Sequence, residues 1–265
     1  LYSQRVRSTH PALIEGIHGQ YAAAGSRIVN ANTFGASAHK LAGSAYTLEQ
    51  VIAAGIANCK RACAPYGALT ALDVGPLGEL LEPSGTLAFE DAVAESARIV
   101  KAGEAAGADL IFFETYTDLY ELKAALLAAK ENTHLPILAS MSFEAGGRTF
   151  TGCTVESFAA TARGLGADAV GINCSLGPKE IFPMAKRLAE AVPGNFPVFV
   201  KPNAGLPRAD GSGYDITPQL FALQMKPYQE LHLFAAGGCC GTTPAHIAAL
   251  RKALDALPEG AAMPW

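Results

Sequence analysis

Two adjacent cysteines, Cys239 and Cys240, lie in the stretch "LFAAGGCCGTTPAHIAAL" at residues 233–250. Adjacent cysteines do not reach disulfide geometry without straining the peptide between them, so the pair is not expected to bond to itself. Cysteine thiolates are also ligands for zinc. The flanking glycines would let the backbone bend so that both sulfurs face one ion. The pair therefore predicts a metal site.

A third cysteine, Cys174, directly follows the apolar stretch "ADAVGIN". If these apolar stretches are parallel strands of one barrel, their carboxyl ends meet on one face, and the three thiols converge there. Three protein ligands leave one position of a tetrahedral zinc free for a substrate, which is the catalytic arrangement. The spacing of Cys174, Cys239 and Cys240 is not that of a zinc ribbon. It predicts a zinc site open to a substrate.

The remaining cysteines, Cys59, Cys63 and Cys153, lie in a helical stretch or beside a loop. A cysteine in such a place most often packs as a small apolar residue, and the sequence assigns these three no further role. The six histidines have no spacing that would bind a metal better than the cysteines do. We expect His18 on the surface.

Short apolar runs alternate with alanine-rich stretches of helical spacing along the whole chain. This alternation is typical of parallel βα units. The expected strands begin near residues 27, 69, 108, 135, 167, 196 and 231. A (β/α)8 barrel has eight strands, and no strand pattern precedes the first helical stretch. The sequence therefore predicts an α/β fold, a (β/α)8 TIM barrel whose first strand is absent from the chain. A doubly wound open sheet is the alternative, but no GxGxxG motif follows any expected strand.

Composition narrows the class of protein. The chain has 265 residues, of which 50% are hydrophobic and 17% charged, and its net charge is -4. A chain without a basic run is not expected to bind nucleic acid, and no apolar segment is long enough to span a membrane. With no change in composition along the chain, we expect a single cytoplasmic domain over residues 1–265. The first residue is Leu1, which is consistent with a start inside a longer chain.

Several motifs occur together and in order. "GINCSLGP" lies at 171–178, "KPNAGLP" at 201–207 and "GGCCGTTPAHIAAL" at 237–250. With "DVGPLGELLEPSG" and "FFETYTDLYELKAAL", they resemble the homocysteine S-methyltransferase family. Within it they are most similar to the homocysteine-binding module of cobalamin-dependent methionine synthase. The resemblance runs from about residue 10 to residue 250.

The resemblance implies a zinc-binding barrel that binds the homocysteine thiol on the metal. By their motifs, Cys174 of "GINC" and both cysteines of "GGCC" correspond to the three zinc ligands. The implied reaction is methylation of homocysteine to methionine.

The resemblance also implies roles for four polar residues. Glu114 of "FFET" corresponds to the acidic residue that binds the substrate's ammonium group. Asn203 of "PNAG" corresponds to a residue near the metal that fills the fourth position when homocysteine is absent. Asn173 and Thr115 are expected to support the site.

The methyl donor is left open. A corrinoid such as methylcobalamin is expected, but the chain has neither a corrinoid-binding motif nor a second barrel for folate, so the donor would be carried by another domain or protein. Two alternatives remain: a thiol methyltransferase that uses S-methylmethionine or another donor, and a degenerate zinc-binding barrel without turnover.

The family's glycine-rich first strand, which helps to bind the substrate carboxylate, has no counterpart before His10. A longer natural chain, a shortened form, and a strand supplied by a partner chain all remain open as explanations.

Overall fold

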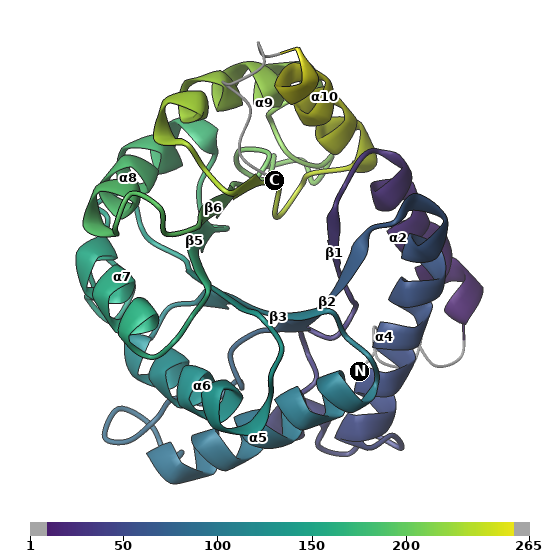
Figure 1. Ribbon diagram of the computed structural model, residues 1–265, viewed down its shortest axis with the longest axis vertical. Coiled ribbons are helices and arrows are strands. Elements are labelled where there is room, and N and C mark those ends of the chain that lie inside the picture. The colour runs from purple at the N-terminus through teal and green to yellow at the C-terminus, as the bar shows by residue number, and fades with distance from the viewer. Residues whose placement is uncertain (1–9, 257–265) are drawn as a thin grey trace.

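The computed structural model describes residues 10–256. Seven parallel strands form one sheet in which each strand pairs with the next along the chain. The strands are β1 (Ile28–Asn30), β2 (Leu69–Val74), β3 (Leu110–Tyr116), β4 (Ile137–Met141), β5 (Ala169–Asn173), β6 (Val198–Lys201) and β7 (Ala235–Ala236). The strands curl around a central axis with the helices outside them (Figure 1). The predicted alternation of strands and helices in a barrel is confirmed.

Helices follow the strands and cover the outer face of the sheet. They are α2 (Pro11–Ala23), α3 (Ala38–Leu41), α4 (Leu48–Cys63), α5 (Phe89–Ala105), α6 (Leu119–Asn132), α7 (Val155–Gly164), α8 (Pro178–Ala191), α9 (Pro218–Met225) and α10 (Pro244–Asp255), with 3-10 turns η1 (Ala64–Tyr66) and η2 (Lys226–Leu231). Threonine caps begin several of them: the Thr47 hydroxyl accepts a hydrogen bond from the Gln50 amide, and Thr154 does the same for Ser157. Such caps satisfy amides that have no partner within the helix. No helix in the described part of the chain is both long and apolar enough to cross a membrane.

The barrel interior is built in layers. Successive side chains of a strand point to opposite faces, so every second residue faces the barrel axis. One apolar layer consists of Ala71, Leu110, Phe112, Leu138, Ala169 and Phe199. Two residues further toward the carboxyl ends of β2, β3, β4 and β6, the inward positions become polar. These positions are occupied by Asp73, Glu114, Ser140 and Lys201. The polar layer therefore lies on the apolar one, at the end of the barrel where βα folds carry their sites.

The sheet does not close within residues 10–256, because β1 and β7 each pair with a single neighbour. A cavity of about 500 Å³ lies between them, bounded by α2, α10 and the inner face of the sheet. This agrees with the predicted barrel that lacks its first strand.

Two local predictions are wrong. The strand expected near residue 231 is shorter, because η2 continues to Leu231 and His232 adopts a left-handed backbone with φ of 48°. His18, expected on the surface, is buried on α2 beside the cavity. Burial lowers its pKa to about 4, and its Nε2 atom has no hydrogen-bond partner among the described residues.

Candidate metal and substrate site

The three cysteines predicted as ligands lie together at the carboxyl ends of the strands. The sulfurs of Cys174, Cys239 and Cys240 all lie within 4.8 Å of one another, and those of Cys174 and Cys240 are 3.6 Å apart. Two sulfurs bound to one tetrahedral zinc at the usual bond length are about 3.8 Å apart. The donor set and its spacing therefore fit one zinc ion with three thiolate ligands.

Cys174 follows β5 in an unusual backbone conformation. Both Cys174 and Ser175 have φ of 62°, in the left-handed region that residues other than glycine seldom adopt. The conformation is held from the neighbouring strand, because the Cys174 amide donates to the Lys201 carbonyl at 3.1 Å. Such strained positions are concentrated at functional sites. Here the strained turn carries a sulfur that belongs to the cysteine cluster.

The "GGCCG" loop depends on its glycines. A Cβ atom on Gly238 would lie 2.4 Å from the Thr242 side chain, so no larger residue fits there. Two hydrogen bonds anchor the loop. The Thr242 hydroxyl donates to the Cys239 carbonyl at 2.6 Å, and the Cys239 amide donates to the Pro202 carbonyl at 2.8 Å. Gly241 has φ of 78° and packs against the Tyr214 ring. These contacts turn two adjacent cysteines toward one point.

The pKa values of the three thiols are shifted in different directions. Hydrogen bonds from Cys174 and then Cys240 to the Cys239 sulfur lower its pKa to about 2, with Lys201 and Asn173 acting in the same direction. The pKa values of the other two thiols are raised, in each case chiefly because of the hydrogen bond to Cys239. One thiolate is therefore already favoured at this position, and thiolates are the form that binds metal.

Asn173 links the cysteines to β3. Its Oδ1 atom accepts hydrogen bonds from the Thr115 amide at 2.9 Å and the Ser140 hydroxyl at 2.8 Å. Its Nδ2 group donates to the Thr115 hydroxyl at 2.8 Å and faces the Cys239 sulfur at 3.7 Å. The side chain is fully buried. Asn173 and Thr115, both predicted to support the site, therefore share one hydrogen-bond network with Cys239.

Glu114 lies within β3 rather than after it and points into the barrel. Its Oε2 atom accepts a hydrogen bond from Nζ of Lys201, and both side chains are largely buried. The ammonium of Lys201 also lies 4.5 Å from the centre of the Phe112 ring. Glu114 thus lies in the barrel interior, where it is already paired with a cation from β6.

Asp73 on β2 completes this charged group. Its carboxyl is 7% exposed, and its Oδ1 atom has no hydrogen-bond partner within residues 10–256. Burial and then the charge of Glu114 raise its pKa, while Lys201 opposes the rise. No role was predicted for Asp73 or Lys201, although a lysine directly before "PNAG" at the end of a strand was a usable signal.

Asn203 lies beside the cysteine loop. Its side-chain Oδ1 atom accepts a hydrogen bond from the Cys240 backbone amide at 3.1 Å. The backbone amide of Asn203 donates to the Leu176 carbonyl at 2.9 Å. A carbonyl oxygen has a second lone pair, so this bond leaves Oδ1 able to accept again. Asn203 is therefore placed near the cluster, and its role as a fourth ligand stays a prediction.

The other cysteines do not join the cluster. Cys59 and Cys63 are buried on α4 with their sulfurs 3.8 Å apart, and Cys153 packs partly buried against the core. Packing accounts for their positions, as the sequence suggested.

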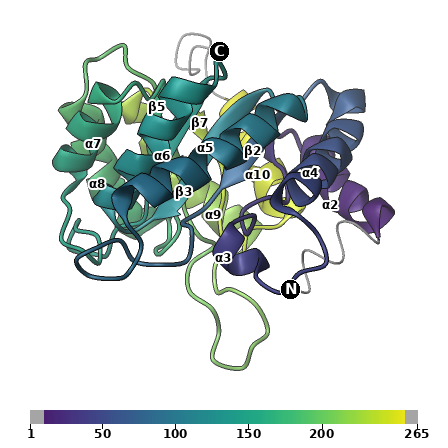
Figure 2. The same cartoon turned by 90° about the horizontal axis from the view of Figure 1, so that it is seen from below.

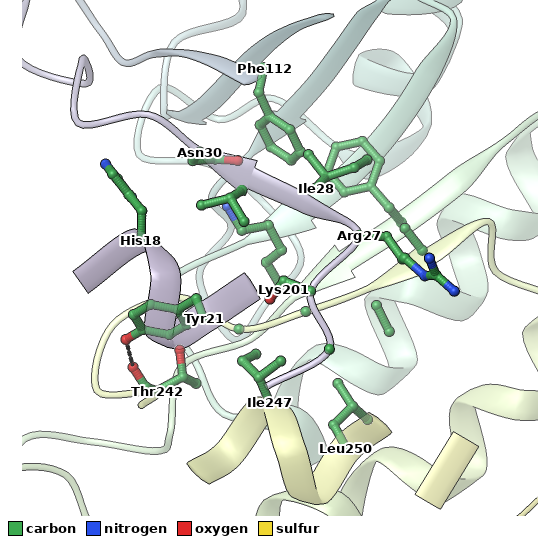
Figure 3. Close-up of a pocket in the computed structure, with 18 of the residues that line it drawn as sticks. His18, Tyr21, Arg27, Ile28, Asn30, Phe112, Lys201, Thr242, Ile247 and Leu250 are labelled. Atoms are coloured by element: carbon green, nitrogen blue, oxygen red, sulfur yellow. Dashed lines mark hydrogen bonds between the residues drawn. The ribbon is translucent and has the colours of Figure 1, made fainter. Parts of the chain in front are cut away.

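The cavity at the open edge of the sheet borders the charged group. Lys201 and Asp73 line its inner wall, while Tyr21 and Thr242 bridge its outer side through a hydrogen bond of 2.8 Å (Figure 3). The long loop between β6 and α9 extends away from the barrel (Figure 2). Tyr214 of this loop reaches back to Cys240.

The fold and the site define a parallel βα barrel that carries a cluster of three thiols where its strands end. Residues 1–254 match the homocysteine S-methyltransferase family, and the chain belongs to that family. The resemblance inferred from the motifs is therefore confirmed.

Curated relatives and solved structures agree with this assignment. The chain is 32% identical over 259 residues to methionine synthase of Mycobacterium tuberculosis, covering 91% of this chain and 21% of that protein. It is also 32% identical over 274 residues to methionine synthase of Mycobacterium leprae, covering 96% of this chain and 22% of that protein. The chain thus spans about a fifth of the length of these relatives.

The fold is shared with a homocysteine methyltransferase of known structure. The metallated form of MmuM from Escherichia coli superposes with a TM-score of 0.81 at 24% identity, covering 95% of this chain and 88% of that one. The oxidized form of the same enzyme gives a TM-score of 0.79 at 25% identity, with the same coverage of both chains.

Proposed function

We propose that this chain is a zinc-dependent S-methyltransferase that binds homocysteine through its sulfur and methylates it to methionine. The observation that carries the proposal is the cluster of three cysteine sulfurs at the strand ends, close to a buried carboxylate that faces the barrel interior. Membership of the homocysteine S-methyltransferase family supports the choice of thiol.

Zinc would be held by Cys174, Cys239 and Cys240, and it would supply a substrate thiolate at neutral pH, since coordination to a dication deprotonates a thiol. A free thiol is mostly protonated at this pH, and the thiolate is the nucleophile. In the reaction, the sulfur electron pair forms a bond to the methyl carbon of the donor. The donor keeps the electrons of the broken bond, and the thiol proton is lost to solvent.

The neighbouring residues would bind and orient the amino acid. Glu114 would bind its ammonium group, and Asn173 would hold the Cys239 sulfur in place with help from Thr115. Asn203 would occupy the open position near the metal until homocysteine enters. The methyl transfer then needs no further acid or base from the chain.

We propose a corrinoid, with methylcobalamin as its methylated form, as the donor. It would be carried on another domain or on another protein. The relatives named methionine synthase support this choice, and the chain matches about a fifth of their length.

S-methylmethionine is the alternative donor. It is kept because the chain covers 88% of the solved homocysteine methyltransferase MmuM of Escherichia coli, but only about a fifth of the relatives named methionine synthase. A barrel that binds zinc without turnover is the second alternative.

The test is methyl transfer to homocysteine by the zinc-loaded protein, with methylcobalamin and S-methylmethionine offered separately and methionine measured as the product. Methionine formed from methylcobalamin supports the proposal. Activity with S-methylmethionine alone would replace the donor, and zinc-loaded protein that is inactive with both donors would favour the degenerate barrel.

A further inference from the structure

The Lys201–Glu114 pair differs from the other ion pairs in the described part of the chain. Its side chains are 17% and 11% exposed, whereas every other ion pair there has both side chains at least 31% exposed. Removing two charges from water is costly, and a buried pair seldom repays that cost in stability. A lysine in this place therefore calls for a reason other than folding.

Lys201 is held as a cation by its surroundings. Its Nζ group donates a hydrogen bond to the buried Glu114 carboxylate. The face of the Phe112 ring, 4.5 Å from Nζ, adds a further favourable contact for an ammonium. The charge of Lys201 is therefore a fixed feature of the pocket.

Asp73 lines the same cavity as Lys201. The Oδ1 atom of this buried carboxyl has no partner within residues 10–256. That oxygen offers Lys201 a hydrogen-bond acceptor when Glu114 turns one of its oxygens to another cation. The three groups together are able to accept an incoming ammonium without leaving Lys201 unpaired.

An α-amino acid carries an ammonium and a carboxylate on one carbon atom. Glu114 and Lys201 present opposite charges side by side in the barrel interior, and the Lys201 carbonyl accepts a hydrogen bond from the amide of Cys174 in the sulfur cluster. A zwitterion placed against this pair would make the charges alternate, with the ammonium on Glu114 and the carboxylate on Lys201. Charge-assisted hydrogen bonds of this kind are roughly twice as strong as neutral ones.

We propose that Lys201 binds the carboxylate of the thiol substrate, so that the Lys201–Glu114 pair selects zwitterionic α-amino acid thiols over thiols that lack either charge. This inference rests on the proposed function, because it takes the sulfur cluster as the place where the substrate thiol binds. It adds Lys201 as a specificity-determining residue.

The test uses protein loaded with cobalt(II), whose thiolate absorption reports binding of a further thiol without any methyl donor. Three thiols are titrated: homocysteine, 3-mercaptopropylamine, which lacks the carboxylate, and 4-mercaptobutyrate, which lacks the ammonium. The wild type is expected to bind homocysteine about tenfold or more tightly than either analogue.

Lys201→Met should weaken binding of homocysteine and 4-mercaptobutyrate about tenfold or more, and leave 3-mercaptopropylamine unaffected or improved. Glu114→Gln should weaken binding of homocysteine and 3-mercaptopropylamine and leave 4-mercaptobutyrate unaffected or improved. Lys201→Arg keeps the cation and should restore the preference for homocysteine. Lys186→Met, on the exposed face of α8, is the matched control and should bind all three thiols as the wild type does.

Lys201→Met leaves a buried carboxylate without its partner, so folding is checked by circular dichroism and by cobalt content. The Lys201→Met/Glu114→Gln double variant removes that unpaired charge and should bind the three thiols with similar affinity. Equal binding of homocysteine and 3-mercaptopropylamine by the wild type would overturn the inference, as would equal weakening of all three thiols by Lys201→Met. If no thiol perturbs the cobalt spectrum of the wild type, the proposed function itself fails.

Discussion

The side-chain amide of Asn173 faces the sulfur of Cys239 at 3.7 Å, while the oxygen of the same amide is held by the Thr115 amide and the Ser140 hydroxyl. The orientation of the amide is therefore fixed from β3 and β4. A group held in this way can donate to a thiolate but cannot turn away from it. Such outer contacts orient metal ligands and tune their basicity.

Asn173→Ala should weaken zinc binding by about 10- to 100-fold, because the Cys239 sulfur loses its oriented donor. The zinc dissociation constant, measured in competition with a chromophoric chelator, checks this. Asn132→Ala is the control, since that asparagine only caps the Ala128 carbonyl on α6. Equal zinc affinity of wild type and Asn173→Ala would mean that the contact does not matter to the metal.

The purified, metal-replete protein should contain one zinc per chain, and Cys239→Ala should lose it. Removing one of three thiolates leaves two protein ligands, fewer than the three that hold zinc in a catalytic site. Elemental analysis of both proteins gives the result directly. Cys153→Ala removes a thiol outside the cluster and should keep the metal. A metal-free wild type that still methylates homocysteine would contradict the zinc mechanism.

The stability of the protein should depend on the protonation of Glu121. This carboxyl is buried on α6, where it accepts a hydrogen bond from the Leu77 amide at 2.7 Å, and burial raises its pKa to about 7 from its ordinary value of 4.5. The folded state thus binds the proton more tightly than the unfolded state does. The contribution of this group to stability is full below pH 4.5 and is lost as the pH rises to 7.

Glu121→Gln keeps an oxygen for the Leu77 amide but cannot ionise. The free energy of unfolding of the variant minus that of wild type should therefore increase between acid and neutral pH, by up to about 3 kcal/mol. Urea unfolding at pH values on either side of this interval measures the difference. Glu131→Gln, on the exposed part of the same helix, should not change the pH dependence. A parallel pH dependence of Glu121→Gln and wild type would argue against an ionising Glu121.

Gly171→Ala should destabilise the barrel interior by about 1–3 kcal/mol, because the interior is close-packed. A Cβ atom on Gly171 would lie 2.3 Å from the Phe199 ring, which fills the apolar layer beside β5. Chemical denaturation measures the loss. Gly164→Ala on α7 meets nothing within 4 Å and should be neutral or slightly stabilising. A Gly171→Ala protein as stable as wild type would show that Phe199 can move away.

The cysteines could be predicted from the sequence because their positions follow from one rule. Cys174, Cys239 and Cys240 each lie just beyond the end of an apolar run, and parallel strands of a barrel end on the same face. The structure brings their sulfurs together as that rule requires. The alternation of strands and helices was readable for the same reason, since it depends on short-range patterns of apolar residues.

The charged group could not be predicted in this way. Asp73, Glu114 and Lys201 lie on three different strands, and their meeting depends on which residues face inward and on the register between strands. A shift of one residue would turn each side chain to the other face of the sheet. Burial of His18 was missed because α2 packs beside the open edge of the sheet, which no local pattern reveals.

The sequence by itself determined the barrel class, the family and the three thiols, because periodicity and short motifs encode strand ends and ligand types. Only the tertiary structure decided that Lys201 pairs with Glu114, that Asp73 keeps a carboxyl oxygen without a partner, and that β1 and β7 remain apart within residues 10–256. The physical reason is that charge pairing, burial and sheet closure arise between residues distant in the chain. Their energies depend on distances that exist only once the strands are assembled.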